Sequence, residues 1–393
     1  MRTFSVRAVA ATASAAIALT LTACTGADTP SEIHDTVRIG WQLPMSGPLE
    51  SVGADMREAF TLYLKEHNGQ LGNRTVELTV TDEGTSGKKA KESIARLIDK
   101  DVVAVAGVVS AAAFDTVAPA LQEVGLPLIG TGERPHVGPG VPTGLWQVSW
   151  GSDEPGRAIA PYLASETGGS TFVIASNDLS GKAQADSFLT EFAEADGSLA
   201  NSSGDAAYVG SNDLGQQLAN AAASGASAVY AAFSAERAVD FVAQYMQSPA
   251  ADIPLYGGFL TEEPLLDEQG TKARGLFSVS NYYSTIDNEA NRDFVAAWAR
   301  HYRGQPNAYA LAAWDATLVL DRAIAQIPLD VEVTPELLND AISRVGEVDS
   351  PRGPWRFSET SHSPVQRWYL RQVTKDGPAL VNTVIADLAT LGG

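Results

Sequence analysis

The chain has 393 residues, of which 45% are hydrophobic and 19% are charged, so a globally disordered protein is excluded and two domains are expected at ~100–200 residues each. Its 47 acidic and 27 basic residues give a formal net charge of −20, which argues against binding to nucleic acid or to an anionic membrane surface. A single cysteine excludes an intramolecular disulfide and a cysteine-based metal site.

The N-terminal residues predict an export signal. Basic residues precede the apolar stretch 8–21, which is too short to span a membrane comfortably and ends in Leu-Thr-Ala directly before Cys24. This cysteine resembles that of a bacterial lipobox, which implies a lipoprotein signal peptide over 1–23 and lipidation of Cys24. The alternative is a plain signal peptide with an incidental cysteine. Residues 24–36 are polar and contain glycine, proline and serine, so they predict a flexible tether.

From residue 37 on, apolar strands and amphipathic helices alternate. Strand patterns lie at 37–43, 76–80, 102–109 and 127–130, and helical patterns at 56–64, 90–98 and 114–121. The alternation continues with helices at 154–166, 183–195, 214–224 and 235–247 and strands at 171–175, 206–209, 228–233, 254–257 and 276–279. Three helices follow at 288–302, 308–326 and 335–344, and then short strands near 355–357, 366–371 and 380–382. This order predicts an α/β protein with two doubly wound, parallel-sheet lobes.

Doubly wound sheets bind ligands outside the carboxyl ends of their strands, so the loops at these ends are the candidate binding segments. Ser46 and Asp178 lie in two of these loops. Ser110 lies in a third, between a buried strand and a helix. The free N–H groups of that helix, from Ala111 on, suit a ligand carboxylate. The alternative for Ser110 is an ordinary helix N-cap.

Five short segments carry a further signal. They are Pro44-Met45-Ser46-Gly47-Pro48, Val105-Ala106-Gly107-Val108-Val109-Ser110, Gly125-Leu126-Pro127-Leu128-Ile129, the Ser152-Asp153 turn and Trp314-Asp315-Ala316. In this order, they resemble the type I periplasmic binding proteins of the leucine/isoleucine/valine-binding group, and the resemblance extends from about Val37 to the C-terminus. The resemblance implies a Venus-flytrap protein, in which two lobes close on a small ligand.

The same resemblance implies three crossover segments between the lobes. We expect them near Gly151, Ser280 and Pro354. Lobe one would then comprise residues 37–150 plus 284–350, and lobe two would comprise residues 151–280 plus 355–393.

The resemblance also implies how one end of the ligand is held. The family binds an α-carboxylate partly through the serine that Ser110 matches, and a neighbouring loop adds a backbone N–H and a hydroxyl. Here that loop contains Gly132, and Glu133 and Arg134 stand where small or hydroxyl residues are usual. Arg134 could clamp an anion with its planar guanidinium, or it could be a solvated loop residue.

At the other end, the chain departs from the family. The family's amine-binding acid matches Phe259, although a loop shift could bring Glu262 or Glu263 to the same place. Three positions where aromatic residues are expected carry Val52, which we place in the loop ending at residue 53, Ser180 and Ser234. Leucine, isoleucine and valine are therefore expected to bind poorly.

Four aromatic residues could build a different wall of the site. They are Trp150, Tyr256, Phe259 and Tyr282. The alternative for each is packing in the core or the hinge, which is the commoner role of buried aromatic side chains.

Enzyme signals are poor. No two of the five histidines have metal-ligand spacing on one helix face, there is no G-x-S-x-G motif, and the run at 84–89 lacks the spacing of a phosphate loop. We expect a lipid-anchored, extracytoplasmic solute-binding protein that needs no cofactor and delivers a small ligand, amino-acid-like or bearing a carboxylate or amide, to an ABC importer. The expected partners are this ligand, the permease subunits and, through the lipid alone, the membrane. Nucleic acid is not a partner, and a monomer is expected.

Two other functions stay open. The first is a ligand-sensing ectodomain of the same fold that feeds a signalling partner. The second, less favoured, is a secreted hydrolase.

Replacement of Cys24 by alanine should release the protein into the medium or leave it unprocessed, because the lipid is attached to the cysteine sulfur. Cell fractionation and mass spectrometry of the mature N-terminus measure this outcome, with Thr25→Ala as the control. A wild-type protein with a free, unmodified N-terminal residue would contradict the lipobox.

Overall fold

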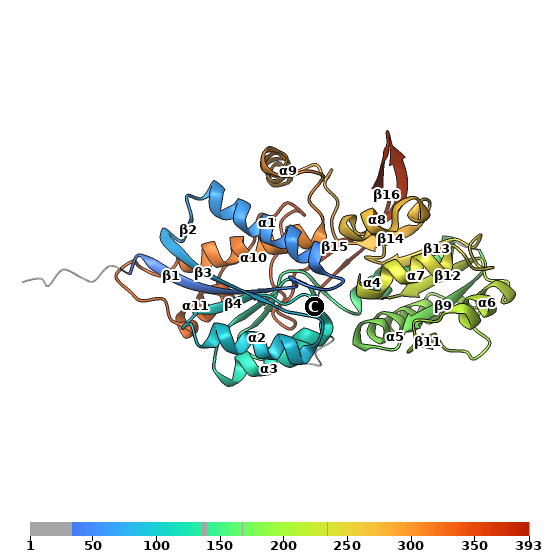
Figure 1. The fold of residues 1–393 in the computed structure, drawn as a ribbon, viewed down its shortest axis with the longest axis horizontal. Helices are drawn as coiled ribbons and strands as arrows, with labels where there is room; N and C mark the ends of the chain where they lie inside the picture. Colours follow the sequence, from blue (N-terminus) through green and yellow to red (C-terminus); the bar gives the residue numbers. More distant parts are fainter. Residues whose placement is uncertain (1–33, 136–139, 167, 234, 393) are drawn as a thin grey trace, which may run out of the picture.

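The computed structural model describes residues 34–135, 140–166, 168–233 and 235–392. The predicted signal peptide, Cys24, most of the predicted tether and Ser234 lie outside the described residues. The described chain forms two α/β lobes, each built around its own sheet (Figure 1). Among the described helices, none is both long and apolar enough to cross a membrane.

The first lobe contains a six-stranded sheet of order β2-β3-β1-β4-β5-β7. Its strands are β1 (Thr36–Leu43), β2 (Gln70–Leu71), β3 (Arg74–Asp82), β4 (Ala104–Gly107), β5 (Leu128–Gly130) and β7 (Leu145–Gln147). Neighbouring strands are parallel except β2 and β3. The helices of this lobe are α1 (Glu50–Glu66), α2 (Gly87–Ile98), α3 (Ala111–Glu123), α9 (Glu289–His301), α10 (Ala308–Ile324) and α11 (Pro335–Ser343).

Helices cover both faces of this sheet. Figure 1 shows α1 and α10 on one side and α2 and α3 on the other. Strand β4 is buried on both faces: Ala104 and Ala106 join the core formed with α1 and α10, whereas Val105 joins the core formed with α2 and α3. This explains the continuous apolar run in the sequence.

The second lobe contains a sheet of order β10-β9-β12-β13-β14-β15-β16, with β11 paired to β9. Its strands are β9 (Ser170–Ser176), β10 (Ser198–Leu199), β11 (Ala207–Val209), β12 (Ala228–Ala232), β13 (Leu255–Gly258), β14 (Phe277–Ser280), β15 (Gln366–Asp376) and β16 (Ala379–Leu391). Its helices are α4 (Glu154–Glu166), α5 (Leu179–Glu194), α6 (Gly215–Ala223), α7 (Ala235–Tyr245), α8 (Glu263–Gln269) and the 3₁₀ turn Gly270–Ala273. The short strands β6 (Glu133–Arg134) and β8 (Trp150–Gly151) pair separately.

Three details differ from the expectation. The second sheet is mixed, because β15 runs antiparallel to both β14 and β16. The two C-terminal strands are longer than predicted, because a tight turn with Gly377 at φ 58° joins them into one hairpin. Val52 is fully buried inside α1, which begins at Glu50, and so is not a loop residue.

Arg352 links the segments that run between the sheets. Its guanidinium forms a buried ion pair with Asp315 of α10, at 2.7 Å, and donates to the side chain of Gln366. The Gln366 amide donates to the carbonyl of Ser149, at 2.6 Å, and its oxygen accepts from Asn281, at 2.8 Å. The chain passes between the sheets after β7, after β14 and after α11, so this network holds all three passages together.

The buried pair of Arg371 and Glu262 supports a stability prediction. The side chain of Arg371 is 1% exposed and that of Glu262 is 0% exposed. Arg371→Leu leaves the Glu262 carboxylate buried without its cation, so the free energy of unfolding should fall by about 3–5 kcal/mol, measured by urea denaturation.

Arg292→Leu is the matched control, because it breaks a pair with Asp287 whose side chains are 61% and 94% exposed. It should change the free energy of unfolding by no more than about 0.5 kcal/mol. Equal effects of the two substitutions would contradict the assignment.

Candidate functional site

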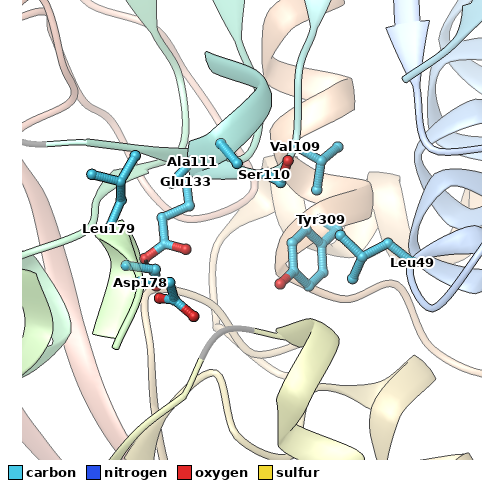
Figure 2. Close-up of a pocket in the computed structure, with 10 residues that line it drawn as sticks. Leu49, Val109, Ser110, Ala111, Glu133, Asp178, Leu179 and Tyr309 are labelled. Atoms are coloured by element: carbon cyan, nitrogen blue, oxygen red, sulfur yellow. Dashed lines mark hydrogen bonds between the residues drawn. The ribbon is translucent and has the colours of Figure 1, made fainter. Parts of the chain in front are cut away.

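A cavity of about 290 Å³ lies between the lobes. It is lined by Leu49, Val109, Ser110, Ala111, Ala112, Glu133, Asp178, Leu179, Ser180 and Tyr309 (Figure 2). Most of these residues lie at the connection between a strand and the helix that follows it. These connections are β4 to α3 in the first lobe and β9 to α5 in the second. Tyr309 comes from the first turn of α10, far along the chain. The cavity therefore occupies the position that doubly wound sheets offer to ligands.

At the start of α3, the donors of Ser110 are bound to a carboxylate of the protein itself. Glu83 accepts hydrogen bonds from the Val109 N–H at 2.7 Å, the Ser110 N–H at 3.0 Å and the Ser110 hydroxyl at 2.8 Å. The Ser110 oxygen also accepts from the Ala113 N–H at 3.2 Å and so caps the helix. The group expected to hold a ligand carboxylate thus already holds an internal one.

Glu133 is the central polar side chain of the cavity. One of its carboxylate oxygens accepts from the Ser180 hydroxyl at 2.6 Å and from the Gln184 amide at 3.4 Å. Burial raises the pKa of Glu133 to about 7, and the nearby charge of Asp178 adds to the rise, whereas its hydrogen-bond donors oppose it. Asp178 itself caps α5, because its side chain accepts from the Gly181 N–H at 2.8 Å.

Four of the residues predicted from the sequence line this cavity: Ser110, Ala111, Glu133 and Asp178. Ser46 and Gly132 do not. The Ser46 hydroxyl donates to Asp82 at 2.7 Å, away from the cavity. Gly132 lies against the backbone of Val109, and a Cβ at Gly132 would approach the Val109 carbonyl oxygen to 2.1 Å.

Arg134 is neither solvated nor directed into the cavity. Its side chain is buried, and the guanidinium donates to the carbonyl of Ser361 at 2.7 Å and to the hydroxyl of Ser363. These contacts fix the segment before β15 rather than an anion in the cavity.

The predicted aromatic wall is divided. Trp150 and Phe259 stack with ring centroids 3.9 Å apart, and Trp150 also meets the ring of Tyr309 at 5.3 Å. These two residues therefore lie behind Tyr309 instead of lining the cavity. Tyr256 stacks on Phe277 in the second sheet. The Tyr282 hydroxyl donates to Asn291 at 2.8 Å, within the core.

Neither glutamate after Phe259 replaces the expected amine-binding acid. Glu262 is paired with Arg371 and accepts from the Ala308 N–H at 3.0 Å, and Glu263 accepts from Asn382 at 3.2 Å. Both carboxylates are therefore bound to other residues of the protein, and neither lines the cavity.

Sequence reasoning missed Leu49, Val109, Leu179 and Tyr309 as lining residues. Glu83 was missed as well, although it directly follows β3, at one of the strand ends where binding loops were expected. The sequence around Tyr309 does not indicate a binding residue, because only the packing of α10 against the first lobe brings Tyr309 to the cavity. Among the described residues, no group of three or more histidine, cysteine or acidic side chains could hold a metal ion.

A cavity lined from two α/β lobes is the arrangement of a two-lobed solute-binding protein. The profile of the periplasmic binding protein family matches residues 36–378, and the chain belongs to this family. As a member of this family, the chain is a solute-binding protein and not an enzyme.

Several individual proteins are similar to this chain over nearly their whole length. Leu/Ile/Val-binding protein homolog 6 of Brucella melitensis is 24% identical over 376 residues, which cover 91% of this chain and 93% of the relative. A solute-binding protein from Rhodopseudomonas palustris, solved in complex with benzoate, has a TM-score of 0.77 at 24% identity and covers 90% of this chain and 98% of its own. A leucine-binding protein from Thermotoga maritima has a TM-score of 0.78 at 20% identity. The match covers 90% of this chain and 98% of that protein's chain.

Glu83→Ala should destabilise the protein, because it leaves the buried N–H group of Val109 and the part-buried N–H group of Ser110 without their acceptor. Each unpaired group costs about 1–3 kcal/mol, so the free energy of unfolding should fall by roughly 2–6 kcal/mol at most in urea denaturation. Glu123→Ala, at the exposed end of α3, is the control. A Glu83→Ala variant as stable as the control would show that this carboxylate does not hold the start of α3.

Proposed function

We propose that this chain is a lipid-anchored, extracytoplasmic binding protein that captures a small polar ligand between its lobes and delivers it to an ABC importer. The observation that carries the proposal is the cavity of about 290 Å³ lined from both lobes. Its size favours a small ligand, since it lies at the lower end of ligand-pocket volumes. The similarity to ABC-transporter solute-binding proteins supports the importer as the partner.

The proposed mechanism is closure of one lobe on the other. The lobes are residues 37–150 plus 284–350 and residues 151–280 plus 355–393, and the network around Arg352 is the pivot. A ligand that contacts both lobes stabilises the closed form over the open form, and this shift needs no cofactor. The closed protein is then the form that docks on the permease.

The proposed ligand is amino-acid-like or bears a carboxylate or amide. The cavity pairs polar groups at Glu133, Asp178 and Ser110 with apolar surface from Leu49 and Val109, which suits a ligand with one polar end and one apolar end. The relatives support this class, because one is named for branched-chain amino acids and another was solved with benzoate.

A thermal-shift screen over amino acids, amides, small aromatic acids, amines and sugars should identify ligands that raise the melting temperature. A ligand at 100 times its Kd adds ~2.7 kcal/mol of stability. Ala112→Trp should abolish the shift, because this exposed residue lines the cavity. Ala95→Trp, on the exposed face of α2, should leave the shift unchanged.

The outcomes separate the proposal from its rivals. Ligand shifts that survive Ala112→Trp would place binding elsewhere. A ligand that binds in the cavity but is not taken up through the importer would favour the sensing ectodomain. A library that yields no ligand at all would contradict a solute-binding role.

A further inference from the structure

The charged side chains that line the cavity are all acidic. They are Glu133 and Asp178, and no lysine, arginine or histidine contributes to the lining that the structure describes. Figure 2 shows both carboxylates on the same side of the cavity, with the ring of Tyr309 across from them. The remaining lining is small or apolar. A ligand carboxylate placed here would meet like charge without a cation to offset it.

The cation that follows Glu133 in the chain does not correct this imbalance. Arg134 directly follows Glu133, but its guanidinium is bound to the segment of Ser361 and Ser363. Its charge interacts with Glu154 and Asp153, outside the cavity.

Part of the usual place for an anion is also taken. At the start of α3, the hydroxyl of Ser110 and the N–H groups of Val109 and Ser110 are bound to Glu83. A carboxylate of the ligand would have to displace this internal carboxylate or lie beside it. Both arrangements bring two negative charges together, so Glu83 offsets the attraction of the start of α3 for an anionic ligand.

From this geometry we propose that the ligand presents a protonated amine to Glu133, with Asp178 beside it, and that the cavity prefers small amines with an apolar body over the matching carboxylic acids. This inference rests on the proposed function and narrows its ligand class, because it favours ligands with an amine over ligands whose polar end is a carboxylate alone. The ammonium would donate to the Glu133 carboxylate, which already accepts from Ser180, and the apolar body would lie against Leu49, Val109 and Tyr309.

The proposal predicts a pH dependence of binding. The groups that face Glu133 are Asp178, Ser180 and Gln184 from α5, Ser152 from the turn before α4, and Tyr230 from β12. Of these, Asp178 and Tyr230 are titratable, and burial raises the pKa of Tyr230 so that it stays neutral at physiological pH. The pKa of Glu133 is raised from the ordinary value of a glutamate to about 7, so the fraction of ionised Glu133 increases as the pH rises through 7. Since a cation needs that form, affinity should be roughly tenfold higher at pH 8 than at pH 6.

The test uses probes that share an apolar body and differ in the polar end. One set is 3-methylbutylamine, leucine and 3-methylbutanoate, and the other is benzylamine and benzoate. Both amines stay protonated between pH 6 and 8, as a lysine side chain does. Calorimetry with the full-length protein should give tighter binding of each amine than of the matching acid.

Glu133→Gln keeps the shape of the side chain and removes its charge. It should weaken amine binding at least roughly tenfold, as expected for loss of a hydrogen bond to a charged group, and should abolish the pH dependence. Asp340→Asn, an exposed position on α11, makes the same change in net charge and should leave binding unchanged. If Glu133→Gln fails to fold, the pH series on the wild-type protein still decides.

Three results would overturn the inference. The first is that no amine binds. The second is that an acid binds more tightly than its matching amine. The third is that the carboxylic acids bind more tightly at pH 6 than at pH 8, which would mean that protonated Glu133 donates a hydrogen bond to the ligand. In each case, a leucine or benzoate that binds and is blocked by Ala112→Trp leaves the proposed function standing, whereas failure of every compound in the screen rejects both.

Discussion

Each carboxylate buried where the lobes meet needs donors or a cation, and this constraint determines what the cavity can bind. Glu83 takes three donors at the start of α3, Glu262 is paired with Arg371, and Asp315 is paired with Arg352. Glu133 differs from these, because it lines the cavity itself, where hydroxyl and amide donors reach it and no cation of the described chain joins it. Burial without a cation disfavours the charged form, so this is the carboxylate whose charge a ligand can compensate most.

The same polar contacts relate the cavity to motion of the lobes. Glu133 follows β5 of the first lobe, yet its donor Ser180 lies on α5 of the second. A single hydrogen bond of this kind contributes only about 1–3 kcal/mol net, because water replaces it when the lobes separate. The network around Arg352 is different, since its ion pair with Asp315 is almost fully buried and would leave charges unpaired if broken. This difference supports the proposed closure, in which the cleft side of the molecule opens while the passages between the sheets stay fixed.

Features that depend on local sequence could be predicted, whereas features that depend on distant partners could not. The buried strand before Ser110 and the helix after it follow from an apolar run and a capping residue, and the structure has both. The direction of Arg134 does not follow, because the carbonyl that binds it lies 227 residues further along. The placement of Tyr309 likewise depends on how α10 packs on the first lobe. Glu83 was accessible in principle, since it stands at a strand end.

The lining of the cavity consists mostly of residues at strand ends, which can change without altering the sheets. Position 133 illustrates how this happens. Gly132 lies so close to Val109 that no side chain fits, and the Glu133 N–H donates to the Val109 carbonyl at 2.8 Å, so the backbone of this loop is fixed independently of the side chain at 133. The resemblance implies a small or hydroxyl residue at position 133, so a glutamate there adds negative charge to the cavity while the loop keeps its course. Under the proposal above, one side chain determines whether the cavity prefers a cationic or an anionic ligand. Overall similarity to a benzoate- or leucine-binding protein does not determine this preference.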